Sequence, residues 1–197
     1  MRTNSAGRLL AVIVAVVGAL MLQVTVLPHF AWRVGGLGVV PDLVLLVVVA
    51  TALATDTRYA TLTGFFAGLV LDIAPPADHL AGRWALALTV VGYVIGRLAH
   101  DNTAEVARFE PDGARRPPLT LVLAAAAGAS FVGTSVFALT GVFLNDASAG
   151  VGDLLPVALV ALVLDVIAAL VVVPAVWWLL RRLGADRAAQ QTQWARA

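Results

Sequence analysis

The residues of this chain that could do chemistry inside a membrane are its aspartates. Asp165 lies near the middle of a long apolar stretch, and Asp72 lies at the end of another. Hydrocarbon strongly disfavours a carboxylate, so each must face protein or water. Asp165 has two interpretations: a proton, ion or substrate site, or a protonated side chain hydrogen-bonded to a neighbouring helix. The partners that we consider for the second are Thr134, Ser135 and Gln23.

Paired aspartates could form an intramembrane aspartyl protease, but the Gly-x-Gly-Asp pattern of that class is missing. The absence of cysteine excludes disulfides, thiolate zinc sites and a cysteine nucleophile. His29, His79 and His100 stand apart, and no zinc-binding, serine-nucleophile or phosphate-binding motif occurs. No arginine-rich tract points to nucleic acid. We therefore predict no enzyme, no catalytic or metal-binding residue, and no cofactor.

A second polar group is expected at the outer membrane face. Pro41 and Asp42 open one predicted helix, where proline fits the first turn and aspartate complements the helix dipole. Asp72 ends the next helix, and Arg83 precedes the one after it. A carboxylate–arginine pair there could be structural or could bind a partner.

Two pairs of glycines have the small-xxx-small spacing that lets membrane helices approach closely: Gly64 with Gly68, and Gly92 with Gly96. We expect them to pack helices of one chain together. The alternative is a contact between copies of the chain in a homo-oligomer.

Composition predicts the elements that hold these residues. The chain is 60% hydrophobic and 13% charged, whereas soluble domains are about 25% charged. We predict an all-α integral membrane protein, a single domain with a six-helix transmembrane bundle. The expected helices cover residues 8–27, 42–55, 59–74, 84–99, 119–144 and 154–180.

The distribution of arginine predicts the orientation, because arginine accumulates in cytoplasmic segments. With the N-terminus in the cytoplasm, 11 of the 13 arginines fall on that side, and only Arg33 and Arg83 fall outside. Both termini, a loop at 100–118 and a tail at 181–197 are therefore expected in the cytoplasm. Because the second and third helices are short, a re-entrant hairpin of the two is an alternative that moves Arg58 alone to the other side.

Two segments are alike: Leu69-Val-Leu-Asp-Ile-Ala and Leu162-Val-Leu-Asp-Val-Ile. They fall in the third and sixth predicted helices, which run in opposite directions, as in an inverted repeat.

The first half of the chain resembles the family of the rod shape-determining protein MreD. The resemblance rests on Gln23 and Pro28, Pro41-Asp-Leu-Val-Leu-Leu, Gly64-Phe-Phe-Ala-Gly-Leu-Val-Leu-Asp-Ile, Gly82 and Val91-Gly-Tyr-Val-Ile-Gly-Arg. The second half is similar in hydropathy and size only, and the segment 100–118 is longer than the family pattern leads us to expect.

The resemblance implies a non-enzymatic scaffold in the bacterial cell (plasma) membrane that takes part in peptidoglycan synthesis. Its expected partners are membrane lipid, an MreC-like scaffold, MreB filaments, the RodA glycosyltransferase and a penicillin-binding transpeptidase. The resemblance also implies a fold related to the substrate-binding subunits of energy-coupling-factor vitamin transporters. A transporter subunit is the alternative function, and it would need a polar cavity lined by Gln23, Asp72, Arg83 and Asp165.

Overall fold

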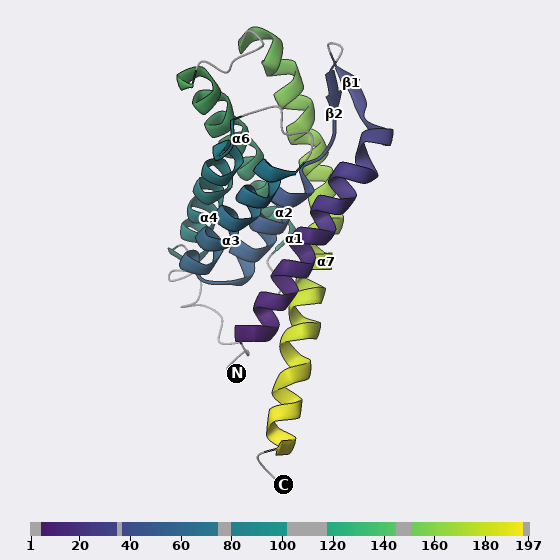
Figure 1. Ribbon diagram of the computed structural model, residues 1–197, viewed down its shortest axis with the longest axis vertical. Helices are drawn as coiled ribbons and strands as arrows, with labels where there is room; N and C mark the ends of the chain where they lie inside the picture. The colour runs from purple at the N-terminus through teal and green to yellow at the C-terminus, as the bar shows by residue number, and fades with distance from the viewer. Residues whose placement is uncertain (1–4, 35–36, 75–79, 102–117, 145–150, 195–197) are drawn as a thin grey trace.

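The protein is an assembly of long helices with one small β-hairpin. The computed structural model describes residues 5–34, 37–74, 80–101, 118–144 and 151–194. In chain order the elements are α1 (Ser5–Thr25), the 3-10 helix η1 (Leu27–Phe30), β1 (Trp32–Val34), β2 (Leu37–Val39), α2 (Leu43–Ala54), α3 (Thr57–Ile73), α4 (Arg83–Asp101), α6 (Leu119–Phe143) and α7 (Val151–Trp194). The helices lie side by side, and the start of α1 and the end of α7 lie at the same end of the molecule (Figure 1).

Three of these helices are long and apolar enough to cross a membrane: α1, α6 and α7, over Ala6–Thr25, Leu119–Phe143 and Leu155–Leu183. The helix α2 is apolar but shorter. The prediction of an all-α membrane protein is confirmed at this level. The count of six spans remains a prediction.

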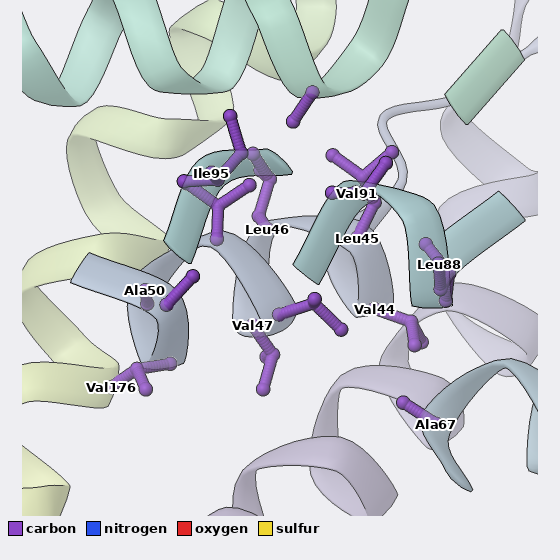
Figure 2. Packing of buried hydrophobic residues seen from close by; sticks show 14 of the residues in the cluster. Val44, Leu45, Leu46, Val47, Ala50, Ala67, Leu88, Val91, Ile95 and Val176 are labelled. Carbon is purple, nitrogen blue, oxygen red and sulfur yellow. The ribbon is translucent and has the colours of Figure 1, made fainter. Parts of the chain in front are cut away.

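The helix α2 forms the centre of the core. Every residue from Leu43 to Ala52 is buried, so α2 is covered on all sides. A helix that is apolar all round suits such a position, because it has no charged side chain that would have to reach water. Figure 2 shows side chains of α2 packed against Leu88, Val91 and Ile95 of α4. Val176 of α7 lies on another side of the same helix.

The direction of the helices follows from their contacts. Asp42 and Ala50 of the α2 segment bond to Asp165 and Trp177, which follow in the same order along α7, so α2 and α7 run parallel. The helices α3 and α4 form an antiparallel hairpin, because Gly64 lies against Leu88 and the earlier Ala60 lies against the later Gly92.

Two features differ from the sequence prediction. The segment 28–41 was expected to be a loop, but it contains η1 and an antiparallel hairpin in which Trp32 pairs with Val39 and Val34 with Leu37. The expected tail at 181–197 is helical as far as Trp194, so α7 continues well past residue 180 and extends beyond the start of α1 (Figure 1). Arginine, alanine and glutamine, which dominate this segment, are strong helix formers. Of the predicted loop at 100–118, residues 102–117 lie outside the described residues.

Candidate functional site

The start of α2 is held by side chains from two other helices. The first N–H groups of a helix have no partner within it. Here the Asp42 carboxylate accepts a hydrogen bond from the Leu45 N–H (2.9 Å). Gln23 Oε1, from α1, accepts from the Val44 N–H (3.1 Å), and Asp165 Oδ1, from α7, accepts from the Asp42 N–H (2.7 Å). Helix α2 therefore begins inside the protein, and the N–H groups of Asp42, Val44 and Leu45 have acceptors there.

Asp165 of α7 also joins α6 to this arrangement. Its second oxygen accepts a hydrogen bond from Ser130 Oγ of α6 (2.6 Å), and both side chains are buried, Asp165 with 3% of its surface exposed. Asp165 lies ten residues into the apolar stretch Leu155–Leu183, about 15 Å along the helix. Its hydrogen-bond partners are thus Ser130 and the Asp42 backbone, and Gln23 binds α2 beside it.

Asp72 does for α4 what Asp165 does for α2. Its carboxylate accepts hydrogen bonds from the N–H groups of Gly82 (2.9 Å), Trp84 (3.0 Å) and Ala85 (3.0 Å). Gly82 has a φ of 97°, a conformation that favours glycine, and it turns the chain into the first turn of α4. Only 3% of Asp72 is exposed. The carboxylate therefore fixes the end of α3 to the start of α4.

Arg83 ties the same end of α4 to α6. Its Nη2 donates to the Phe137 carbonyl (2.8 Å), and its guanidinium lies 3.9 Å from the centre of the Phe137 ring. The ring of Trp84 packs on the same phenylalanine at 4.5 Å. The two members of the expected outer-face pair thus act on different neighbours: Asp72 joins α4 to α3, and Arg83 joins α4 to α6. Asp42 lies at the start of α2, and the neighbouring Pro41 is half-buried.

The two similar segments of the sequence have the same local role. Asp72 in Leu69-Val-Leu-Asp and Asp165 in Leu162-Val-Leu-Asp each accept from backbone N–H groups at the start of another helix. Each is therefore an acceptor aimed at the positive end of a helix dipole, where a negative charge is favourable.

The four predicted glycines all lie in the contact between α3 and α4. A Cβ atom added at Gly64 would overlap the backbone of Leu88, and one at Gly68 would overlap the backbone of Trp84 and Ala85. From the other side, a Cβ at Gly92 would overlap the Ala60 backbone, and one at Gly96 would come within 3.0 Å of Thr57 Cα. Each pair therefore lies against the backbone of the other helix within one chain, and the missing side chains allow this approach.

The opposite end of the bundle has its own polar contacts. Arg8 of α1 lies 4.0 Å from Asp56, the N-cap of α3, and 4.3 Å from the centre of the Tyr59 ring. Trp177 Nε1 donates to the Ala50 carbonyl of α2 (3.0 Å). These contacts bring the start of α1, the α2–α3 turn and the second half of α7 together.

Sequence reasoning did not single out Ser130 or Trp177 for these roles. Ser130 follows a run of alanine and glycine, where a hydroxyl is one small residue among many. A tryptophan one turn before an arginine is typical of an interfacial anchor, and Arg181 lies 5.9 Å from the centre of the Trp177 ring. A sequence shows that a tryptophan is near the interface, but the carbonyl that its N–H reaches depends on how α7 packs.

The described residues hold no group of three His, Asp or Glu side chains placed to bind a metal ion. His79 lies outside that part of the chain, and His29 is exposed. What the carboxylates of Asp42, Asp72 and Asp165 do here is accept hydrogen bonds from helix N–H groups and one hydroxyl.

Comparison with known proteins adds one finding. The family model of the rod shape-determining protein MreD matches residues 3–103, just over half of the chain. No curated protein and no solved structure matches the chain.

Proposed function

Since this chain belongs to the MreD family of rod shape-determining proteins, we propose that it is a non-enzymatic scaffold that positions the cell-wall elongation machinery. Membership of this family supports a membrane protein that is involved in the determination of rod shape. The proposal adds the role and the partners: an MreC-like scaffold, RodA and a penicillin-binding transpeptidase.

The observation that carries the non-enzymatic part of the proposal is the use of the buried carboxylates. Both oxygens of Asp72 and of Asp165 accept hydrogen bonds from the protein itself. A catalytic carboxylate needs an oxygen within hydrogen-bond reach of its substrate. Carboxylates engaged in this way suit a rigid framework rather than a reaction centre.

The same observation weighs against a transporter subunit. Such a subunit needs polar groups that converge on a cavity. Gln23, Asp165 and Asp72 instead satisfy the starts of α2 and α4, and Arg83 binds the Phe137 carbonyl. We therefore propose the scaffold alone.

We propose further that all six described α-helices cross the plasma membrane, with both termini in the cytoplasm. The short helix α2 is compatible with this because it is surrounded by protein, which supplies acceptors for the N–H groups of Asp42, Val44 and Leu45 at its start. Non-helical backbone at membrane depth is tolerated where it is buried in protein. In this orientation the β-hairpin lies on the outer side.

We propose the β-hairpin as part of the docking surface for an outer partner. Trp32 of β1 and Phe30 at the end of the preceding η1 are 67% and 72% exposed. Exposed tryptophan side chains are frequent anchors of protein interfaces.

The test is a pull-down from membranes solubilised in mild detergent, with mass spectrometry of the proteins that co-purify. We expect wall-synthesis proteins to co-purify with the natural chain and to be lost with Trp32→Ala. Phe131→Ala is the matched control, because Phe131 is also 67% exposed but lies on α6. Recovery of ATPase and energy-coupling subunits in place of wall-synthesis proteins would contradict the scaffold. Equal recovery with both variants would contradict the hairpin as the docking surface.

A further inference from the structure

The helices α4 and α6 are in close contact at one end and separate toward the other. Near the start of α4, the Trp84 and Phe137 rings stack and Arg83 fills the space beside Gly141. At the middle, a Cβ on Gly133 would lie 3.0 Å from Leu45 and 3.5 Å from Val91. One helical turn and a half further, a Cβ on Gly128 would meet nothing within 4 Å.

This separation leaves a groove of about 300 Å³ between α2, α4 and α6. Its lining is apolar throughout and includes Leu53 of α2, Ile95 and Leu98 of α4, and Leu121 and Gly128 of α6. Ile95, seen in Figure 2, is buried with 4% exposed, whereas Leu98 and Leu121 are 56% and 39% exposed. The groove therefore has a closed floor and opens on the outer surface of the bundle.

The chemistry of the lining restricts what fits. The groove offers no side chain that could bond to a polar ligand, so its occupant must be held by apolar contact alone. A flexible apolar occupant can follow the shape of such a groove.

In the six-span arrangement proposed above, the groove opens on the surface of α4 and α6 that faces lipid. Leu98 and Leu121 belong both to the groove and to the exposed apolar surface of their helices. The molecule that meets this surface in a bilayer is a phospholipid, and its acyl chain is apolar and flexible, which suits the lining of the groove. We propose that the groove between α4 and α6 binds one acyl chain of a membrane phospholipid.

Small residues on α6 make the site. Ala124, Ala125 and Gly128 line the groove from that helix. A Cβ atom added at Gly128 would meet nothing within 4 Å, and Gly128 lines the groove, so we expect a leucine placed there to enter it. Gly18 on α1 has equally free space but lies away from the groove, which makes it a matched control.

The experiment uses the purified full chain in vesicles of dioleoyl phosphatidylcholine. A small share of this lipid carries a photoreactive diazirine in one acyl chain, and the labelled residues are identified by mass spectrometry. We expect labelling at Leu121 to exceed labelling at Leu10 of α1, which is also 39% exposed. We expect the same excess at Leu98 over Leu159 of α7, 56% and 57% exposed.

Gly128→Leu should remove this excess without loss of stability, and Gly18→Leu should leave it unchanged. Labelling that follows exposure alone, or an excess that survives Gly128→Leu, would overturn the proposal. So would a groove whose residues are not labelled by the lipid. Since the sample contains no wall-synthesis protein, the result is independent of the scaffold proposal.

Discussion

At the scale of single residues, the aspartates of this protein act as acceptors for helix N–H groups. An aspartate at a helix start satisfies donors that the helix cannot, and it adds a favourable interaction with the helix dipole. Asp72 accepts three such bonds and Asp165 one, with a serine hydroxyl as its second donor. Both side chains are buried, so water cannot take the place of a carboxylate that is removed. The N–H and O–H groups that it accepted from would then lack an acceptor.

The first prediction concerns Asp72. Asp72→Ala should lower the free energy of unfolding by about 1–3 kcal/mol, because buried donors lose their acceptor. Asp72→Asn should cost less, because one amide oxygen can still accept from Gly82 and Ala85, which share Oδ2. The measurement is unfolding in mixed SDS–detergent micelles followed by tryptophan fluorescence.

The control for Asp72 is Asp56, which caps α3 through the Tyr59 N–H but is 63% exposed. Asp56→Ala should change stability less than Asp72→Ala, because water can replace the lost acceptor. If the two alanine substitutions lowered the free energy of unfolding equally, the burial of Asp72 would not explain how much it stabilises the protein.

The second prediction separates the two interpretations of Asp165. An asparagine there can accept from the Asp42 N–H and donate to Ser130 Oγ, so Asp165→Asn should retain stability and rod shape. Asp165→Ala should be less stable by about 1–3 kcal/mol. Cell shape is measured in a strain depleted of its own copy of the protein, and stability as for Asp72. A stable asparagine variant that fails to restore rods would instead make Asp165 a proton or ion site.

At the scale of elements, backbone contact decides how the α3–α4 hairpin forms. Neither helix was found among the spans that length and hydropathy identify. Their association depends on glycines, since association of helices in lipid is driven by close packing rather than by the hydrophobic effect. The glycines of each helix lie against the backbone of the other.

The third prediction tests this contact. Gly68→Leu places a side chain where the Trp84 and Ala85 backbone lies, so α3 and α4 must separate. We expect a loss of about 1–3 kcal/mol, typical of overpacking, with membrane insertion retained. Gly18→Leu, which meets open space, should leave stability unchanged. An unaffected Gly68→Leu variant in the same micelle assay would contradict the hairpin geometry.

At the scale of the whole molecule, polar contacts gather at two ends of an apolar core. At one end, Asp42 caps α2, and Asp72 at the end of α3 accepts from the start of α4. At the other end, Arg8 contacts Asp56 and Tyr59. The helix α2 begins at the end that holds Asp42 and leads to the opposite end. The α2–α3 turn therefore lies beside the start of α1, where Arg8 contacts Asp56. This places Arg58 on the side of the termini.

The fourth prediction uses the absence of cysteine, which makes single introduced cysteines unambiguous reporters. Arg33→Cys in β1 should react with a membrane-impermeant maleimide added to intact cells with a permeable outer envelope. Arg58→Cys at the α2–α3 turn should react only after the membrane is opened. Reaction of Arg58→Cys from outside would favour the re-entrant arrangement of α2 and α3 instead of six spans.

Much of the fold could be predicted because lipid restricts what a chain can do. Every backbone group in hydrocarbon needs an internal partner, so a composition this apolar predicts helices. Proline, glycine and aspartate mark where those helices begin and end. The predicted starts at residues 42, 59 and 84 lie close to Leu43, Thr57 and Arg83, where α2, α3 and α4 begin.

The sequence alone determined the membrane class, the approximate starts of α2, α3 and α4, and the family, because these follow from composition, periodicity and local motifs. Only the tertiary structure decided that Asp165 meets Asp42 and Ser130, residues 123 and 35 positions away. It also decided that α2 is enclosed and that a groove opens beside Gly128. Such contacts depend on the rotation and separation of packed helices, and an apolar sequence leaves both undetermined because many faces of its helices are alike.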